Sequence, residues 1–345
     1  MSRNVHLVGS VPLASAALVF ETVSAALGPT LKRLPDGETG ERLNWVGHLE
    51  AVFAACPALE RTDEVFRIHP TAIGWHRYRL RKGKRVADLS FENLFYAEHA
   101  KQSYETLKTL KNAGKVPPGM RFQVDLVPAH SVLWLFLVDE LHAAVDSLYN
   151  QAVKREIDKI AAAIPHADLA IQFDVASAVF ARLERGQPSS YGSTRDEMQD
   201  TFTEILVDLG NHVPPNIELL YHLCYGDNDH KHVIEPTDMG DMVEFTNRLL
   251  SRIGRPVQLV HMPVPCNRSD TAYFRPLERL RLPHETELCL GLVHFTDGVE
   301  GAKLRLSAAQ HYVQQFSVGT ECGFGRRKPE TIPELLRIHS EVAAL

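Results

Sequence analysis

One short segment of the sequence places an imidazole and a thiol two residues apart. Residues 217–225, IELLYHLCY, begin as an apolar run typical of a buried strand and contain His222 and Cys224. Side chains of a strand alternate between its two faces, so these two groups project to the same side. The pair alone is compatible with chance, with a redox site or with half of a metal site.

A more distant cysteine could complete a metal site. Zinc prefers thiolate and imidazole ligands, and catalytic zinc sites commonly use three protein ligands and keep one position open. His222, Cys224 and Cys322 would supply one nitrogen and two sulfur atoms. From the spacing alone two interpretations remain: a catalytic zinc site, or ordinary buried cysteines beside a helix-capping histidine.

These residues need a fold that brings them together. Eight short apolar runs alternate with amphipathic helical patterns along the chain. The proposed strands are residues 4–10, 31–38, 121–128, 168–176, 217–226, 256–265, 287–295 and 315–325. Repeated strand–helix units predict an α/β fold, a single (β/α)8 TIM barrel over residues 1–345, with a doubly wound open sheet as the alternative. The basic segment at about residues 72–92, with its central KGK turn, predicts a β-hairpin inserted after the second strand and before its helix.

Polar residues recur where the proposed strands end. In TIM-barrel enzymes the active site lies at the C-terminal ends of the strands. The residues at these ends are Ser10, Glu38, His130, Asp174, His222 with Cys224, His261, His294 and Cys322. Individually each has an ordinary explanation, because Ser, Asp and Glu often cap the following helix. Their occurrence at all eight ends nevertheless predicts an active site on this side of the barrel.

Composition narrows the classes of function. The 345 residues have a net charge of -6 and no basic block, which argues against nucleic-acid partners. No apolar run approaches the ~20 residues that span a bilayer, and the N-terminus lacks a signal-peptide pattern, so we expect a cytoplasmic protein without a membrane partner. Five cysteines, an odd and sparse set, argue against a disulfide framework. A homo-oligomer is compatible with these data.

The DNDHKH segment, residues 227–232, is interpreted as a solvated loop rather than as a second metal cluster.

Several short motifs, in this order along the chain, resemble those of one protein family. HLVGSVP resembles an IGSxP strand, DGETGERLNWV resembles GExxRxDMV with one residue inserted, YHLCY matches HxCY, and TECGFGRR falls on DCGLxxR. The pattern is that of the C-terminal domain of cobalamin-independent methionine synthases and their shorter relatives, in the uroporphyrinogen decarboxylase/methionine synthase-like superfamily. IQFD falls on the family motif QxDEP but lacks its Glu-Pro, and the chain covers only the catalytic barrel of that family.

The resemblance implies a metal site. His222, Cys224 and Cys322 would bind Zn²⁺. His261 falls on the strand where the family has a glutamate ligand, which makes it a candidate fourth ligand.

The resemblance also implies a substrate site and an activity. Ser10, Glu38 and Asp174 fall where the family binds its amino acid substrate, and His294 falls on its proton-donating histidine. The implied reaction is a zinc-dependent methyl or alkyl transfer, in which a small-molecule thiol attacks a methyl or alkyl donor as thiolate. The alternative is a lyase, decarboxylase or hydrolase that acts on a small organic substrate on the same barrel, with or without zinc.

Overall fold

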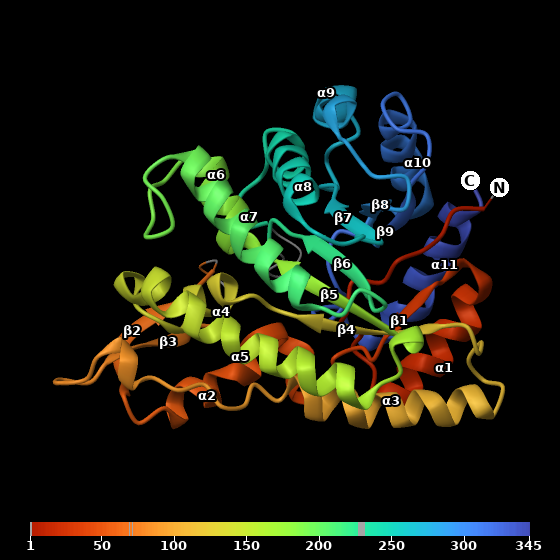
Figure 1. Cartoon of the computed structure of the whole chain (residues 1–345). Coiled ribbons are helices and arrows are strands. Elements are labelled where there is room, and N and C mark those ends of the chain that lie inside the picture. The colour runs from red at the N-terminus through yellow and green to blue at the C-terminus, as the bar shows by residue number, and fades with distance from the viewer. Residues whose placement is uncertain (1, 69, 71, 227–231) are drawn as a thin grey trace.

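The molecule is built around a curled sheet of parallel strands with helices on its outer side (Figure 1). The computed structural model describes residues 2–68, 70, 72–226 and 232–345. His230, in the segment expected to form a solvated loop, lies outside the described residues.

Seven strands form the sheet in sequence order, and every neighbouring pair is parallel. The strands are β1 (Arg33–Pro35), β4 (Arg121–Leu126), β5 (Leu169–Val175), β6 (Glu218–Leu223), β7 (Leu259–Pro263), β8 (Glu287–Val293) and β9 (Ser317–Thr320). All residues of β5 and β7 are buried, as expected for parallel strands covered on both faces. The predicted α/β class is therefore confirmed, and seven of the eight proposed runs contain a strand of this sheet.

Helices follow most of the strands and connect each to the next. They are α1 (Ala16–Leu27), α2 (Glu50–Ala55), α3 (Tyr96–Asn112), α4 (Ala129–Phe136), α5 (His142–Ala163), α6 (Ser177–Arg185), α7 (Arg195–His212), α8 (Gly240–Arg252), α9 (Thr271–Phe274), α10 (Gly298–Ala309) and α11 (Ile332–Ala343). Side-chain caps mark the start of α1, α7 and α9. At α7, for example, the Thr194 hydroxyl accepts a hydrogen bond from the Glu197 amide while the Glu197 carboxylate accepts one from the Thr194 amide. Among the described residues, no helix is long and apolar enough to cross a membrane.

The first proposed strand, residues 4–10, differs from the prediction. It forms isolated parallel bridges instead of a regular strand, and Val5 bridges both Leu31 on one edge of the sheet and Val318 on the other. The Val5 amide donates to the Thr30 carbonyl at 2.9 Å, and the His6 amide donates to the Val318 carbonyl at 3.0 Å. The neighbouring β1 has three residues and ends in Pro35, which has no N–H to donate, so few ladder bonds can form here.

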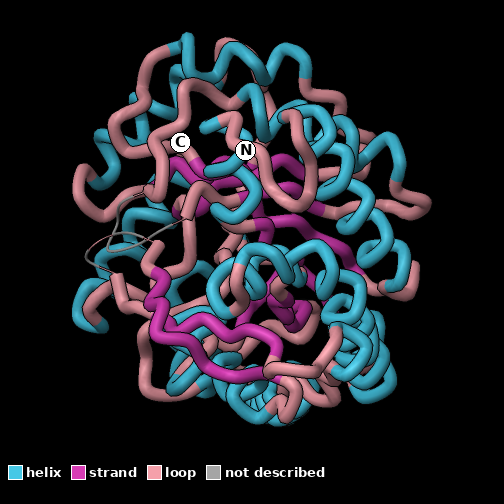
Figure 2. The backbone as a smooth tube through the Cα atoms, turned by 90° about the vertical axis from the view of Figure 1, so that its left-hand side faces the viewer, coloured by secondary structure: helices cyan, strands magenta, loops and turns pink. Residues whose placement is uncertain are grey.

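The predicted hairpin needs a correction. Its first half is a strand, β3 (Trp75–Leu80), but β3 pairs with the preceding β2 (Leu59–Phe66) and not with residues after the KGK turn. Those residues form a 3-10 turn, Val86–Asp88, in which the Asp88 carboxylate accepts a hydrogen bond from the Arg85 amide at 2.8 Å. The β2–β3 hairpin lies apart from the main sheet (Figure 2). It still falls between β1 and α3, as the sequence predicts.

Candidate metal centre

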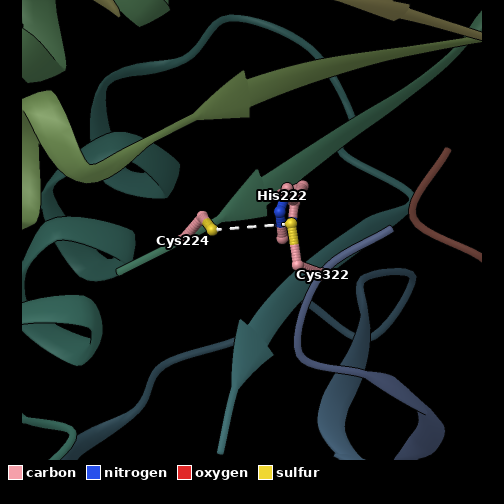
Figure 3. A group of neighbouring side chains, drawn as sticks. All are labelled: His222, Cys224 and Cys322. Atoms are coloured by element: carbon pink, nitrogen blue, oxygen red, sulfur yellow. Dashed lines mark hydrogen bonds between the residues drawn. The ribbon is translucent and has the colours of Figure 1, made fainter. Parts of the chain in front are cut away.

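Three predicted ligands lie together at the C-terminal ends of two strands. One ligand atom each from His222, Cys224 and Cys322 lies within 4.8 Å of the other two. His222 is on β6, Cys224 follows β6 directly, and Cys322 follows β9 (Figure 3). The two sulfur atoms are 3.9 Å apart. His222 and Cys224 are buried, with 2% and 6% of their surfaces exposed, so the group lies inside the protein.

The backbone explains why these side chains converge. His222 lies in register with Asp174 on β5 and with His261 on β7. The Cys224 amide donates to the Val175 carbonyl at 2.9 Å, which continues the β5–β6 ladder past the end of β6. Cys224 therefore keeps strand alternation with His222, and both project to the same side, as predicted.

Both sulfur atoms receive hydrogen bonds from nitrogen donors. The Gly226 amide lies 3.2 Å from the Cys224 sulfur, and the Arg326 guanidinium lies 3.5 Å from the Cys322 sulfur. These contacts help to orient both sulfur atoms within the group.

His261 lies beside His222 rather than beside the sulfur atoms. The two Nδ1 atoms are 2.8 Å apart, and Nε2 of His261 is 2.9 Å from the Thr320 carbonyl oxygen. Burial lowers the pKa of His261 to about 4 despite the hydrogen bond to Thr320. Burial, followed by the neighbouring His261 and His6, lowers the pKa of His222 well below its usual value. Both rings are therefore neutral at pH 7, as a metal-binding imidazole must be. The structure does not bring His261, the candidate fourth ligand, into the group of three.

A cavity of about 420 Å³ opens beside the three ligands. Its polar lining includes the predicted substrate residues and one arginine: Ser10, Glu38, Asp174 and Arg326. Its apolar lining includes Ile68, Ala72, Ile73 and Trp75 from the β2–β3 hairpin and its flanks, with Trp45 and Leu135. The volume suits a small organic molecule. The structure therefore brings Ser10, Glu38 and Asp174 to the same cavity as the metal-ligand group.

The loops after β1 and β9 position two of these residues. The Ser10 hydroxyl accepts a hydrogen bond from the Gly325 amide at 3.2 Å, which joins it to the loop that carries Cys322. Glu38 has a positive φ of 48°, unusual for a residue with a side chain. Its amide donates to the Asp36 carboxylate at 2.8 Å, and Arg42 also binds that carboxylate. The strained turn therefore holds the Glu38 carboxyl at the cavity.

Three carboxyl groups lie close together at this site, those of the buried Asp125 and Asp174 and that of the half-buried Glu38. Burial, reinforced by the nearby Asp174, raises the pKa of Glu38 to about 8. Burial, reinforced by Cys322 and opposed by hydrogen bonds from Gln172 and Trp45, raises the pKa of Asp174 to about 8. Burial and the charges of Asp174 and Glu38 also raise the pKa of Asp125 well above its ordinary value. A cluster that is costly to ionise suits a cationic ligand.

Asp125 was not among the site residues predicted from the sequence. A repeated pattern could have found it, because Gln-x-Asp occurs at residues 123–125 on β4 and again at residues 172–174 on the neighbouring β5. In each copy the glutamine amide donates to its aspartate at 2.9 Å, and both glutamines also donate to the Val8 carbonyl.

Two other histidines that were predicted at strand ends, His130 and His294, are not among the residues that line the cavity. His294, the predicted proton donor, is buried, with Nε2 2.8 Å from the Val264 carbonyl and Nδ1 3.6 Å from the Glu321 carboxylate. His130 lies in α4 rather than at a strand end, and its buried ring packs 5.1 Å from that of Phe202. The chain reaches His130 only after Pro128 has ended the extended segment, so its side chain enters the helical layer.

Solved structures share this fold. No protein-family model and no curated protein sequence matches the chain. A B12-independent methionine synthase from Shewanella sp. W3-18-1, solved with selenomethionine, has a TM-score of 0.67 at 14% identity, covering 100% of this chain and 97% of its own. A putative vitamin-B12 independent methionine synthase from Listeria monocytogenes has a TM-score of 0.53 at 13% identity, with coverages of 100% and 98%. A methyltransferase from Methanosarcina mazei has a TM-score of 0.57 at 11% identity, with coverages of 99% and 94%. These neighbours match the family that the sequence motifs resemble, and at this identity the likeness establishes the fold.

Proposed function

We propose that this protein transfers a methyl or alkyl group to a small-molecule thiol, using Zn²⁺ held by His222, Cys224 and Cys322. The proposal rests on one observation, the convergence of these ligand atoms within 4.8 Å beside a cavity of substrate size. Two sulfur atoms and one imidazole nitrogen fit zinc and match the three-ligand pattern of catalytic zinc sites. The fold shared with methionine synthases and a methyltransferase supports the same reading.

We also infer that the sheet is closed as a (β/α)8 barrel, with the segment around Val5 in the place of the eighth strand. The bridges from Val5 to both edges of the sheet support this. The cavity then lies where TIM-barrel enzymes carry their active sites, at the C-terminal ends of the strands.

The residues around the cavity have separate roles in this proposal. Zinc, when bound, would favour deprotonation of a coordinated substrate thiol at neutral pH. Glu38 and Asp174, with Asp125 behind them, would bind a cationic group of the substrate, because a cation offsets the cost of ionising buried carboxyl groups. Trp45 and Trp75 would contact its apolar part and exclude water.

His294 remains the proposed proton donor to the leaving group. Its ring must then leave the Val264 carbonyl and turn toward the cavity when substrate binds. A His294→Asn variant should keep its metal and lower kcat. An unchanged kcat would exclude this role.

Metal analysis tests the proposal. The wild-type protein should contain about one zinc ion per chain by elemental mass spectrometry, and Cys224→Ala should contain almost none. Cys266→Ser is the matched control, because Cys266 is a free, exposed cysteine away from the ligand group. Zinc-edge X-ray absorption should then show one additional sulfur ligand when the correct thiol is added.

Turnover distinguishes the reaction types. A transferase requires both a thiol and an alkyl donor, whereas a lyase, decarboxylase or hydrolase turns over without a thiol. A wild-type protein that binds no zinc, or that turns over without thiol, would exclude the proposed transfer.

A further inference from the structure

We propose that His261 is a positioning residue that fixes the tautomer of His222 and presents its Nε2 to the metal, rather than a fourth metal ligand. The inference rests on the proposed zinc site and adds the arrangement of hydrogen atoms around it. It assigns a role to the side chain that replaces the glutamate expected from the resemblance.

The hydrogen-bond partners determine where the protons lie. The Thr320 carbonyl can only accept, so Nε2 of His261, at 2.9 Å, must carry a hydrogen. Nδ1 of His222 already lies against Nδ1 of His261, so only Nε2 of His222 is open to a metal. An imidazole that binds a metal through Nε2 carries its hydrogen on Nδ1, and Nδ1 of His261 is placed to accept it. The hydrogen between the two Nδ1 atoms, 2.8 Å apart, therefore belongs to His222. With Nδ1 protonated, Nε2 of His222 has the free lone pair that a metal requires.

Both nitrogen atoms of His261 are engaged in these contacts. The residue is 0% exposed, and neither nitrogen can bind a metal without breaking a buried hydrogen bond. The three-ligand set therefore remains His222, Cys224 and Cys322, and the fourth position stays available for a substrate thiol.

A glycine on the intervening strand makes this arrangement possible. His261 is on β7 and Thr320 is on β9, with β8 between them. A Cβ atom on Gly291 of β8 would lie 2.8 Å from Nε2 of His261 and 2.7 Å from the Thr320 carbonyl oxygen. Both distances are too short for real contacts, so only glycine lets the ring reach across β8.

The same hydrogen bonds connect the nitrogen and sulfur sides of the site. Thr320 accepts from His261 through its carbonyl, and its hydroxyl donates to the Cys322 carbonyl at 2.7 Å. A continuous chain thus runs from His222 through His261 and Thr320 to the backbone of Cys322. His261 therefore holds the imidazole ligand in a fixed position relative to one sulfur ligand.

Three variants test this role by zinc affinity, measured by competition with a chromophoric chelator. His261→Leu removes both hydrogen bonds and should weaken zinc binding about 10- to 100-fold. His261→Gln should retain most of the affinity, because its amide oxygen can accept from His222 and its NH₂ group can donate to Thr320. Gly291→Ala retains the His261 side chain but adds a Cβ atom 2.8 Å from its Nε2, 2.7 Å from the Thr320 carbonyl oxygen and 2.8 Å from the Glu321 Cα. It should weaken binding in the same direction as His261→Leu.

Two spectroscopic measurements test the role of His261 independently of zinc affinity. Zinc-edge X-ray absorption should show one nitrogen and two protein sulfur ligands in both wild type and His261→Gln. In ¹⁵N NMR of the zinc-loaded wild type, His222 should be protonated on Nδ1 and coordinated through Nε2.

Specific results would overturn the inference. They are two imidazole ligands in the wild type with one lost in His261→Gln, coordination through Nδ1 of His222, or unchanged affinity in both His261→Leu and Gly291→Ala. If the wild type binds no zinc at all, the proposed function fails together with the inference. If the wild type binds zinc and any of these three results is obtained, the inference about His261 fails but the proposed function stands.

Discussion

Replacing Asp174 by asparagine should stabilise the metal-free protein, although it removes a proposed substrate contact. Asp174 is 7% exposed, and its pKa rises from 3.8 to about 8 on folding, mainly because burial disfavours the charged form. In the unfolded chain at pH 7 this carboxyl group is ionised, so it must take up a proton when the chain folds. Asparagine is neutral in both states and avoids that cost.

The size of the expected stability change follows from the pKa shift of Asp174. At pH 7 the proton uptake costs about 4 kcal/mol, from 1.36 kcal/mol for each unit between the unfolded pKa and the solution pH. Asparagine can still accept the hydrogen bond from Gln172 through its oxygen but loses that from Trp45, a loss of about 1 kcal/mol. We therefore expect Asp174→Asn to be more stable than wild type by about 2–3 kcal/mol at pH 7.

The difference in stability between Asp174→Asn and wild type should change with pH in a defined direction. Because the pKa of Asp174 is raised in the folded state, the wild type loses stability relative to the variant as pH rises from about 4 to about 8. Urea denaturation of chelator-treated protein at pH 4, 6 and 8 measures this directly. Asp63→Asn, on the exposed side of β2, is the control and should show a small difference at every pH. Equal stability of Asp174→Asn and wild type at pH 7, or a difference that does not vary with pH, would refute the reasoning.

Three further substitutions test the packing that supports the site. Phe53→Ala removes a fully buried ring whose centroid lies 5.1 Å from that of Phe136, and urea denaturation should show a loss of about 3–5 kcal/mol. Asp297→Ala leaves the buried Arg305 guanidinium without its bidentate partner, at 2.6 and 2.8 Å, and should cost about 3 kcal/mol; a loss below 1 kcal/mol would show that solvent compensates the charge. Gly37→Ala puts a side chain at φ 80°, with its Cβ 2.7 Å from a valine of α1, and should lower stability by about 2–3 kcal/mol in thermal denaturation; an unchanged Tm would contradict the stated crowding.

The proposed ligand group was predictable because it depends on strand periodicity and on strand ends. His222 and Cys224 are two residues apart on one strand, and parallel strands bring their C-terminal ends to one side of the sheet. The position of Cys322 could be predicted only if β9 ends on the same side of the sheet as β6. The repeated strand–helix units in the sequence indicate a parallel sheet, in which all strands end on that side.

Features decided by tertiary contacts were not predictable in the same way. The hairpin predicted around the KGK turn did not form, because β3 pairs with the preceding β2, and Tyr78 of β3 also bridges Leu137 after α4. Asp125 stands one residue before the end of β4, as Asp174 does on β5, but the sequence prediction assigned the end of this strand to His130 and therefore missed Asp125. The hydrogen bond of His261 depends on a gap at Gly291, on a different strand.

The bridges of Val5 to residues 31 and 318 have a consequence for biosynthesis. Residues near the start of the chain must wait for β9 to leave the ribosome before their second partner exists. During translation this early segment has one neighbour at most, and its remaining backbone groups are open to chaperones or to mispairing. Cys322 emerges only four residues after Val318. The nascent protein can therefore form the bridges from Val5 to both residues and complete the proposed ligand group at nearly the same moment.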